Sequence, residues 1–311
     1  MRCLVTGGAG FIGSQIQDKL IELGHQVLIV DNLRSGKKAF LNKKSKFYKI
    51  DIRSANKILD LFKKLKPEVV FHLAAQNEVS YSMAHPMEDT QINILGTLNI
   101  LEACKNFGVK KVIYSNTGGA YYGDVPDEDL PITEDYPVSL PTSFYGVSKA
   151  AAEQYIKLYS HLYGSSYVSL RYANVYGPRQ DGNREAGIVA IFTSKILAGE
   201  TPVINGDGLH TRDYIYVGDV VAANIAALSY EKNDYFNIST GVPTTNNEVY
   251  AILEGYLKTG KPVKYGPERP GDARHVILSP EKAKSRLGWS DQVNFREGVR
   301  LTLESYGWKS E

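Results

Sequence analysis

Tyr145 and Lys149 are the residues of this chain whose types and spacing could most directly do chemistry. They follow the turn-forming stretch Pro141-Thr142-Ser143, and residues four apart share one face of a helix, so the ammonium would lie beside the phenol. A neighbouring positive charge lowers the pKa of a phenol, and a phenolate is a general base that can deprotonate an alcohol. Two exposed side chains on an ordinary helix would show the same spacing, so the interpretation depends on the rest of the chain.

A glycine-rich segment follows a predicted strand and opens a predicted helix, which is the context that a dinucleotide-binding fingerprint requires. Its glycines permit a tight turn and close approach to a pyrophosphate, and the helix N-terminus supplies free N–H groups. The spacing is Gly-x-x-Gly-x-x-Gly rather than Gly-x-Gly-x-x-Gly, so the context supports the interpretation more than the letters do. We expect cofactor contacts from Gly7, Gly10, Phe11, Ile12 and Gly13.

Asp31 ends the second predicted strand, 18 residues after Gly13. A carboxylate in this place can accept hydrogen bonds from an adenosine ribose and repel a 2′-phosphate, which favours NAD over NADP. Arg34 is a signal in the opposite direction, because a guanidinium could pair with that phosphate. We give the carboxylate more weight and predict NAD as the cofactor.

The ends of two further predicted strands supply candidate cofactor contacts. Asp51 and Ile52 close the third strand and could contact adenine, although a strand-terminal Asp is equally often a turn former. Leu73, Ala74 and Ala75 close the fourth strand, where small side chains would let the cofactor lie flat against the backbone. Plain close packing would explain these small residues too.

The elements that must position these residues alternate between short β-rich runs and helical patterns. We expect strands at 2–6, 26–31, 46–50, 69–73 and 111–114, and helices at 11–23, 54–65 and 86–107. This alternation is typical of βαβ units. The sequence therefore predicts an α/β fold with a Rossmann-type doubly wound parallel sheet. We expect seven strands of this sheet in the part of the chain up to Arg171. Ser148 is a candidate helix N-cap.

Beyond Gly177-Pro178 the pattern becomes irregular, with a predicted helix at 188–197 and a predicted strand at 213–217. A helix at 219–229 and a strand at 235–238 could return to the sheet. We expect an NAD-binding domain over residues 1–175, to which 212–240 returns, and a smaller, interleaved substrate domain mainly over 176–311.

Composition excludes several classes of protein. The 36 basic and 34 acidic residues leave a net charge of +2, which gives no field suited to nucleic acid or to an anionic membrane. The apolar stretch 4–12 is interrupted by glycines and indicates neither a signal peptide nor a membrane span. Cys3 and Cys104 lie in separate apolar runs, which predicts buried thiols in a reducing compartment. We expect a cytoplasmic protein with a small-molecule substrate and no metal site.

The residues discussed so far belong to a longer series of motifs. The series comprises Gly7-Gly8-Ala9-Gly10-Phe11-Ile12-Gly13, Asn93, Tyr122-Gly123, Tyr145 with Lys149, Arg171-Tyr172-Ala173-Asn174-Val175-Tyr176-Gly177-Pro178-Arg179, Gly206-Asp207-Gly208, Thr211-Arg212-Asp213-Tyr214, Arg269-Pro270-Gly271-Asp272 and Leu287-Gly288-Trp289. With these motifs the chain resembles, over nearly its whole length, the extended short-chain dehydrogenase/reductase family and, within it, the UDP-glucose 4-epimerases.

The resemblance implies a mechanism for the tyrosine and the lysine. Tyr145 would remove the proton from the sugar 4-hydroxyl as hydride leaves C4 for tightly held NAD⁺, and the 4-keto sugar would turn over and take hydride back on its other face. Lys149 would hold the nicotinamide ribose and, together with the cationic ring, depress the pKa of the phenol.

A hydroxyl residue that bonds the sugar O4 is also implied, commonly four positions before the tyrosine of Tyr122-Gly123. This chain has Gly118 there and so departs from the pattern. We expect Thr117 to take the role, because a variant of the family reads Thr-Gly-Gly-Ala in this place, with Ser115 as the alternative.

The resemblance extends the expected site on both sides. Further cofactor contacts are expected from Asn32, Ser35, Gly36, Asn93 and Tyr172, and substrate contacts from Thr117, Tyr145, Asn174, Val189, Asn205, Arg212, Arg269 and Asp272. Arginine suits a diphosphate because its guanidinium offers planar, bidentate hydrogen bonding. Val276 stands where the family gates the sugar pocket, and its medium size leaves N-acetylated sugars open. The family also implies a homodimer in which helices at 86–107 and 148–163 pair across a two-fold axis.

Other functions make different demands on the sequence. A 4,6-dehydratase would carry Asp-Glu directly after Thr117, where this chain has Gly118-Gly119, and a UDP-glucuronate decarboxylase would want an acidic residue before Asp124. A UDP-N-acetylglucosamine 4-epimerase remains an alternative. A non-catalytic NAD-binding regulator would need the glycines but no base, and an interaction module would need no arginines at phosphate positions.

Overall fold

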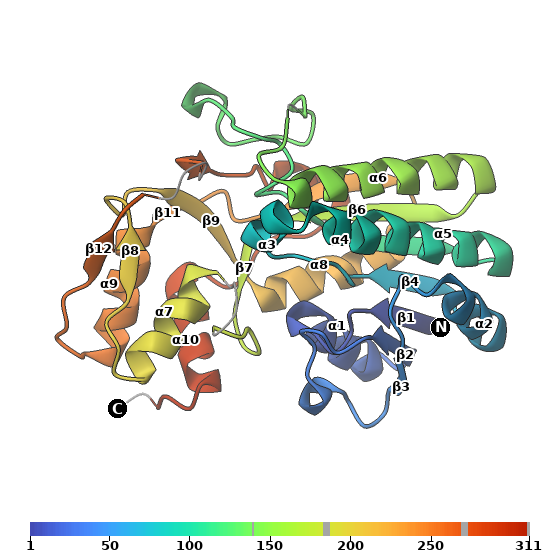
Figure 1. Ribbon diagram of the computed structural model, residues 1–311, viewed down its shortest axis with the longest axis horizontal. Helices are drawn as coiled ribbons and strands as arrows, with labels where there is room; N and C mark the ends of the chain where they lie inside the picture. Colours follow the sequence, from blue (N-terminus) through green and yellow to red (C-terminus); the bar gives the residue numbers. More distant parts are fainter. Residues whose placement is uncertain (139, 183–186, 269–272, 310–311) are drawn as a thin grey trace.

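A seven-stranded parallel sheet forms the centre of the computed structural model, which describes residues 1–138, 140–182, 187–268 and 273–309 (Figure 1). Its strands are β1 (Arg2–Thr6), β2 (Gln26–Asp31), β3 (Lys46–Lys49), β4 (Val69–His72), β5 (Lys111–Thr117), β6 (Ser166–Tyr172) and β10 (Asp234–Ile238). They lie in the order β10-β6-β5-β4-β1-β2-β3. The strand order reverses between β1 and β4, and ligands of such sheets bind in the crevice at that point. The predicted fold class is confirmed.

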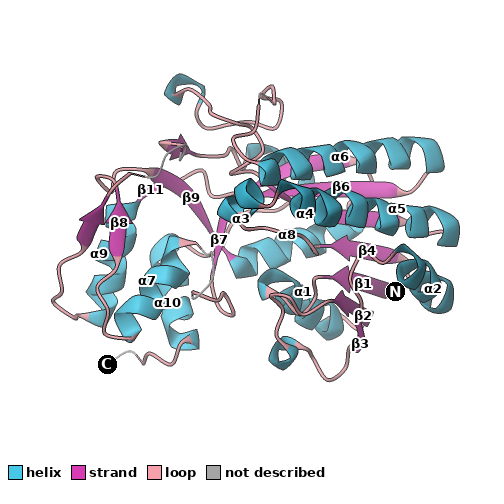
Figure 2. Cartoon of the chain, viewed as in Figure 1, coloured by secondary structure: helices cyan, strands magenta, loops and turns pink. Residues whose placement is uncertain are grey.

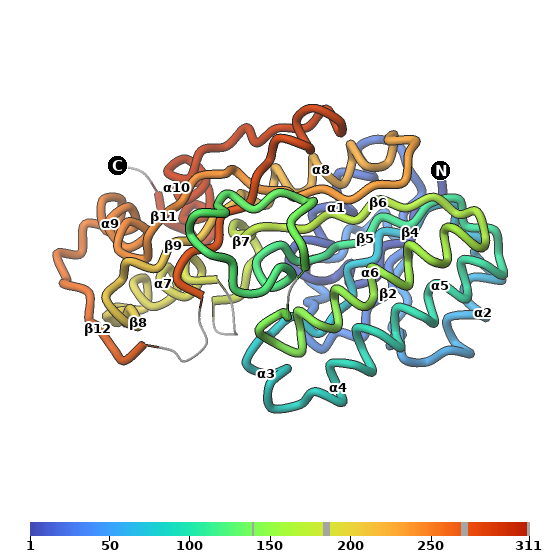
Figure 3. The backbone as a smooth tube through the Cα atoms, turned by 90° about the horizontal axis from the view of Figure 1, so that it is seen from above, coloured from blue at the N-terminus to red at the C-terminus, as the bar shows by residue number. Residues whose placement is uncertain are grey.

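Helices cover both faces of this sheet. Figure 3 shows α1 (Phe11–Glu22) and α8 (Val217–Ser229) on one side of the strands, and α2 (Ala55–Leu65), α5 (Gly96–Phe107) and α6 (Phe144–Tyr163) on the other. Side chains alternate along β1 accordingly: Cys3 and Val5 pack into the core beneath α1 and α8, whereas Leu4 packs into the core beneath α2, α5 and α6. Strands buried on both faces are expected where helices cover a parallel sheet twice.

The seventh strand differs from the prediction, because only six strands precede Ala173 and the seventh, β10, comes from the second half of the chain. It pairs with β6 after α8 has crossed the sheet. A local pattern predicts a strand but not the sheet that the strand will join. The predicted cap is also wrong: α6 begins at Phe144, where Ser143 Oγ accepts from Gly146 N at 3.1 Å, and Ser148 lies inside the helix.

The helix predicted over 86–107 has the expected extent but contains a π-helical turn. It runs through α4 (Pro86–Thr90), η2 (Gln91–Leu95) and α5, after the short helix α3 (Val79–Ala84). Within η2, the Asn93 carbonyl accepts a hydrogen bond from Thr97 Oγ1 at 2.6 Å, which occupies an acceptor that an α-helix would use itself. Such turns are frequent at functional sites.

A smaller part of the chain lies beside the large sheet (Figure 2). It contains β7 (Asn174–Tyr176), β9 (Thr211–Tyr216), β11 (Pro243–Thr245) and β13 (His275–Val276) in one sheet, β8 (Val203–Asn205) with β12 (Lys264–Gly266) in another, and the helices α7 (Ile188–Leu197), α9 (Asn246–Leu257) and α10 (Phe295–Ser305). A separate apolar cluster holds it together, centred on Tyr176, Phe192, Tyr214 and Leu253. The segment 212–240 was predicted to return to the large sheet. Within it, α8 covers a face of that sheet and β10 joins it, whereas β9 belongs to the smaller part.

Short helical turns complete the described chain at η1 (Lys38–Phe40), η3 (Asp127–Asp129) and η4 (Ala283–Leu287). Among the described residues, no helix is both long enough and apolar enough to span a membrane.

Candidate active site

A cleft with a volume of about 340 Å³ lies where the strand order reverses, at the carboxyl ends of the central strands. Most residues predicted to contact the cofactor line it: Gly7, Gly10, Phe11, Ile12, Gly13, Asp31, Asn32, Ser35, Asp51, Ile52, Leu73, Ala74, Ala75, Tyr145, Lys149 and Tyr172. Thr117 and Ser115 line it as well, whereas Gly36 and Asn93 do not. The cleft thus brings the glycine loop and the Tyr145–Lys149 pair into one site.

The glycine loop passes so close to its neighbours that side chains are excluded. Gly7 has φ +69°, and a Cβ on it would lie 2.8 Å from Ala74 N at the end of β4. A Cβ on Gly13 would lie 2.4 Å from the Gly7 carbonyl oxygen. Gly10 precedes α1 without a side-chain cap, so the first N–H groups of the helix keep their capacity for an anion. This loop fits a pyrophosphate.

Asp31 lies at the end of β2 with 7% exposure. Its Oδ2 accepts from Ala9 N at 3.0 Å and its Oδ1 from Leu33 N at 2.7 Å. Burial raises the pKa of Asp31, and these two hydrogen bonds oppose that shift. Each carboxylate oxygen keeps a second lone pair, which suits it to accept from ribose hydroxyls. Gly36 packs against this carboxylate, because a Cβ on it would lie 2.9 Å from Asp31 Oδ1.

Arg34, the signal for NADP, is engaged by residues of the chain itself. Its Nη1 donates to Glu88 Oε1 at 2.7 Å, and its guanidinium lies 4.7 Å from the centre of the Tyr81 ring. The Tyr81 hydroxyl donates to the same Glu88 carboxylate. The positive charge of Arg34 therefore already has a partner, which weakens the case for a 2′-phosphate here.

Tyr145 lies in the first turn of α6, close to the end of β5. A Cβ on Gly146 would lie 2.1 Å from the Ala120 carbonyl oxygen, so a glycine after Tyr145 lets the helix approach the loop that follows β5. The Thr117 hydroxyl, at the last position of β5, hydrogen-bonds the Tyr145 phenol. Thr117 Oγ1 also accepts from Ala120 N at 3.2 Å. A hydroxyl and a phenol thus face each other in the cleft.

Lys149 follows one turn later with only 3% exposure. Its Nζ donates to the Ser115 carbonyl oxygen at 2.5 Å and lies 4.2 Å from the centre of the Tyr114 ring. Burial lowers the pKa of Lys149 to about 7, and the negative charges of Asp89 and Glu153 oppose that shift. The ammonium is held by a carbonyl and an aromatic face rather than by water.

In the chain without cofactor the pKa of the Tyr145 phenol is raised, so its depression by Lys149 together with the cationic ring stays a prediction for the enzyme with NAD bound. Burial raises the pKa of Tyr145 to about 12, the hydrogen bond with Thr117 opposes the shift, and the charge of Asp89 adds to it. The spacing of four places Lys149 on the same helix face, but its ammonium is directed to the Ser115 carbonyl. Desolvation of the phenolate therefore outweighs the helical neighbour, which the sequence pattern could not show.

Residue 118 is a glycine because other residues occupy the space that a side chain would need. A Cβ on it would lie 2.2 Å from Leu278 Cδ1, and its backbone N–H donates to the Tyr172 carbonyl at 2.7 Å. A hydroxyl side chain at this position would have to displace the fully buried Leu278. Thr117 lies one residue earlier with its hydroxyl in the cleft, whereas the Ser115 hydroxyl is hydrogen-bonded to Tyr172.

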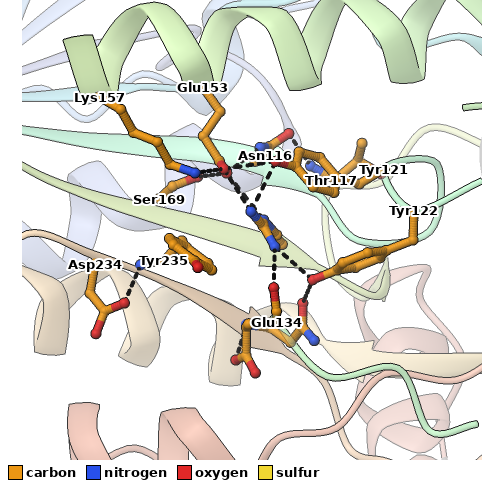
Figure 4. A network of polar contacts seen from close by, with 12 residues as sticks. Asn116, Thr117, Tyr121, Tyr122, Glu134, Glu153, Lys157, Ser169, Asp234 and Tyr235 are labelled. Atoms are coloured by element: carbon orange, nitrogen blue, oxygen red, sulfur yellow. Dashed lines mark hydrogen bonds and ion pairs between the residues drawn. The ribbon is translucent and has the colours of Figure 1, made fainter. Parts of the chain in front are cut away.

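A buried ion pair ties α6 to the strands below it (Figure 4). Glu153 is fully buried, and Arg171 of β6 donates to its two oxygens at 2.6 and 3.1 Å. Asn116 Nδ2 donates to the same carboxylate at 2.8 Å, and Asn116 Oδ1 accepts from Thr117 N at 2.8 Å. Burial alone would raise the pKa of Glu153, but Arg171 outweighs it and holds the pKa well below its usual range. The network fixes Thr117 relative to the helix that carries Tyr145 and Lys149.

His72 makes a second buried connection that sequence analysis missed. Thr6 Oγ1 accepts from Leu73 N and Ala74 N, so its own proton goes to His72 Nδ1 at 2.7 Å. His72 Nε2 then donates to Thr97 Oγ1 at 2.9 Å. Burial lowers the pKa of His72 to about 3, so the ring stays neutral. The chain of hydrogen bonds joins the cofactor cleft to the π-helical turn.

Of the residues predicted to contact the substrate, Thr117 and Tyr145 line this cleft, and four others lie apart from it. Asn174 begins β7, Val189 is buried in α7, Asn205 ends β8 and Arg212 lies in β9, and none of these four lines the cleft. Arg212 Nη1 donates to the Thr211 carbonyl at 2.8 Å, and Arg212 is paired in register with Val276 of β13. Arg269 and Asp272 lie outside the described residues.

Several residues line the cleft that sequence analysis did not select: Val30, Ile50, Gln76, Asn77, Glu78, Ile92, Asn116, Ala173, Val175 and Gln180. Ala173 and Val175 belong to a quoted motif but were not assigned a role, and the others lie in or after strands, in a helix or in a loop outside the quoted motifs. Among the described residues, no group of three or more His, Cys, Asp and Glu side chains could hold a metal ion.

Comparison with known proteins shows the family to which the chain belongs. The model of the "NAD dependent epimerase/dehydratase family" matches residues 3–239. The UDP-glucose 4-epimerase of Mycolicibacterium smegmatis is 42% identical in an alignment of 317 positions that covers 100% of both chains.

Solved structures are similar over almost their whole length. The UDP-glucose 4-epimerase of Thermotoga maritima with UDP-glucose matches with a TM-score of 0.96 and 47% identity over 99% of both chains. The UDP-glucose 4-epimerase of Thermus thermophilus in complex with NAD matches with a TM-score of 0.93 and 42% identity over 99% of both chains. A UDP-N-acetylglucosamine 4-epimerase of Methanobrevibacter ruminantium with UDP-N-acetylmuramic acid matches with a TM-score of 0.92 and 38% identity over 98% of this chain and 97% of that one.

Proposed function

Since the chain belongs to the NAD-dependent epimerase/dehydratase family, we propose that this NAD-dependent enzyme is a UDP-glucose 4-epimerase that interconverts UDP-glucose and UDP-galactose. The observation that carries the proposal is the meeting of Thr117, Tyr145 and Lys149 in the same cleft as the glycine loop and Asp31. The relatives named UDP-glucose 4-epimerase at 42% and 47% identity support the choice of substrate.

The residues present fit the cofactor. Gly7 and Gly13 let the loop pack tightly against β4 and α1, the uncapped N-terminus of α1 offers N–H groups to a pyrophosphate, and Asp31 has lone pairs for the ribose. Bound NAD⁺ supplies the hydride acceptor and donor for C4 of the sugar, together with a positive charge in the cleft. Lys149 would hold the nicotinamide ribose.

In the proposed mechanism Tyr145 Oη takes the proton of the sugar 4-hydroxyl while the C4 hydride leaves, which gives a 4-keto sugar. The sugar then turns over, hydride returns to its other face, and Tyr145 gives the proton back to O4. Thr117 orients O4 and the phenol by donating to either oxygen. A pKa of about 12 in the chain alone means that added positive charge is needed to ionise the phenol near neutral pH.

The nucleotide and sugar would be held by the smaller part of the chain. We assign this role to Asn174, Val189, Asn205, Arg212, Arg269 and Asp272, with the two arginines on the diphosphate.

Purified enzyme incubated with UDP-glucose or UDP-galactose tests the proposal. We expect either sugar to give the same equilibrium mixture, and we expect denatured protein to release NAD. A Tyr145→Phe variant should keep its NAD and its fold but lose activity by about 10²-fold or more, because the base is gone. Full activity in this variant would refute the mechanism.

An N-acetylated substrate is the second candidate. The medium-sized Val276, next to Arg212 in the paired strands, is the observation that favours it, and one similar structure is a UDP-N-acetylglucosamine 4-epimerase. A panel of UDP- and dTDP-sugars with product identification separates the two candidates. Conversion of the N-acetylated pair alone would exclude UDP-glucose as the substrate.

We also propose a cytoplasmic homodimer. Cys3 and Cys104 are free, buried thiols, which suits a reducing compartment. Large apolar side chains are exposed along α6 and beside α5: Leu95, Val147, Tyr155, Leu158, Leu162 and Tyr163. Burying such a face against a second copy is favourable. A Leu158→Glu variant should elute as a monomer in light-scattering chromatography, while Leu209→Glu, with a similarly exposed side chain outside these helices, should not change the mass.

A further inference from the structure

Asp89 is a buried carboxylate that the proposed mechanism does not use. It lies in α4 with 0% exposure. Its Oδ1 accepts from Gln76 Nε2 at 3.1 Å and from Asn93 Nδ2 at 3.1 Å. Burial raises the pKa of Asp89, and its hydrogen bonds with Ser148, Gln76 and Asn93 and the positive charge of Lys149 oppose that shift. A buried carboxylate is costly unless something nearby needs its charge.

The hydrogen bonds of Asp89 lead to α6, the helix that carries Tyr145 and Lys149. Asn93 Nδ2 donates to Ser148 Oγ at 3.0 Å, and Ser148 Oγ donates to the Tyr145 carbonyl at 3.0 Å. Ser148 directly precedes Lys149, so the hydrogen bonds of Asp89 reach the helix turn that carries the proposed base and its cation. Helix α4 packs directly on α6.

Two carboxylates act on Lys149, and one of them is already neutralised. Glu153 is paired with Arg171 at 2.6 Å and with Lys157 at 2.8 Å. Asp89 has no such ion pair among the described residues. Its negative charge is therefore the one left to balance the buried ammonium.

We propose that Asp89 is a positioning residue for the reaction: it is the buried counter-charge that keeps Lys149 an ammonium, and through Asn93 and Ser148 it fixes the first turn of α6. This inference rests on the proposed roles of Tyr145 and Lys149. It assigns a function to a carboxylate that touches neither substrate nor cofactor, because Asp89 does not line the cleft.

The ionisable groups around Asp89 come from two elements. Lys149 and Tyr145 face it from α6, and Tyr114 faces it from β5. The next residue, Glu88, is directed away to Arg34 and Arg53 at the partly exposed rim. Removing the charge of Asp89 would lower the pKa of Lys149 and of Tyr145 together, because a negative charge raises both.

An Asp89→Asn variant tests the proposal, since the amide keeps the Oδ1 acceptor and removes the charge. We expect both limbs of the pH profile of kcat/KM to move to lower pH by about one unit. A role in packing alone would lower the height of the profile and leave the limbs in place, and that result would overturn the proposal. Asp89→Glu keeps the charge and should keep the limbs.

A measurement that needs no activity separates this inference from the proposed function. The titration of Lys149 can be followed by NMR in NAD-loaded enzyme with isotope-labelled lysine, assigned through a Lys149→Met variant. We expect the midpoint for Lys149 to be lower in Asp89→Asn than in the original chain. An unchanged midpoint overturns the proposal even if the enzyme is an epimerase, and a lowered midpoint supports it whatever the sugar. Retained NAD and circular dichroism show that the variant is folded.

Discussion

The Arg34 guanidinium and the Glu88 carboxylate meet at 2.7 Å, which ties the loop after β2 to helix α4. Arg34 lines the cofactor cleft, and the Tyr81 ring lies against its guanidinium. The ion pair therefore joins two segments across the edge of the cleft, and we call it a closure because it would slow the release of a bound cofactor. Because both side chains are partly exposed, its contribution is limited by solvent.

We expect Glu88→Gln to release NAD faster, by up to about fivefold, since exposed ion pairs contribute about 0.2–1 kcal/mol. Loss of bound NAD after dilution into a trap for free cofactor measures the rate. Salt should accelerate release from the original chain more than from the variant. Arg300→Ala, which removes an arginine from ion pairs on α10, should leave the rate unchanged. Equal rates in Glu88→Gln and the original chain would rule out a closure.

The Thr117 hydroxyl is expected to matter more than the Ser115 hydroxyl. Thr117 faces the Tyr145 phenol, whereas Ser115 is engaged with Tyr172. Thr117→Ala should lower kcat by about 10- to 100-fold, because one donor to the reacting oxygen is lost. Thr117→Ser should recover most of that loss, and Ser115→Ala should lower kcat less than Thr117→Ala. If only Ser115→Ala loses activity, the assignment of Thr117 is wrong.

A hydroxyl placed at residue 118 should destabilise the fold rather than rescue activity. The Gly118→Ser Cβ would lie 2.2 Å from Leu278 Cδ1, and such overpacking costs about 1–3 kcal/mol. Leu278→Ala removes the obstructing atoms, so the double variant should be more stable than the sum of the single effects predicts. Urea unfolding of the four proteins gives this coupling free energy. Additive effects would mean that Leu278 is not the obstacle.

His72 should make the fold sensitive to acid. Its pKa is lowered from 6.5 to about 3 in the fold, so between these values the unfolded chain binds a proton that the folded chain does not. Stability is therefore lost as the pH falls from 6.5 towards 3, by about 1 kcal/mol per pH unit from this residue. Urea unfolding at several pH values should show a shallower dependence for His72→Gln. Parallel curves for the two proteins would show that His72 does not titrate on unfolding.

The sequence predicted the features that are carried by neighbouring residues. The glycine loop and Asp31 could be found because strand, turn and helix follow one another along the chain, and the sheet and the NAD cofactor are confirmed. The roles of individual residues stay predictions. Residues 18 apart, such as Glu153 and Arg171, form the buried pair below the site, and no spacing rule indicates such a contact.

The pKa of Tyr145 shows a second limit of sequence patterns. Helical spacing correctly placed Lys149 on the same helix, but it could not show that the ammonium turns to the Ser115 carbonyl or that burial dominates. The carboxylate of Asp89 was equally invisible, because its importance depends on what surrounds it.

The π-helical turn η2 holds about one residue more than an α-helical turn with the same rotation. Deleting one residue within it would restore an ordinary α-helix and leave the residues that follow facing nearly the same way, so Ile100 and Cys104 would stay in the core beneath the sheet. A deletion within α5 would instead rotate everything after it by about 100°. What the deletion in η2 would remove is the widened turn whose Asn93 carbonyl accepts from Thr97 Oγ1, and with it the connection that continues to His72.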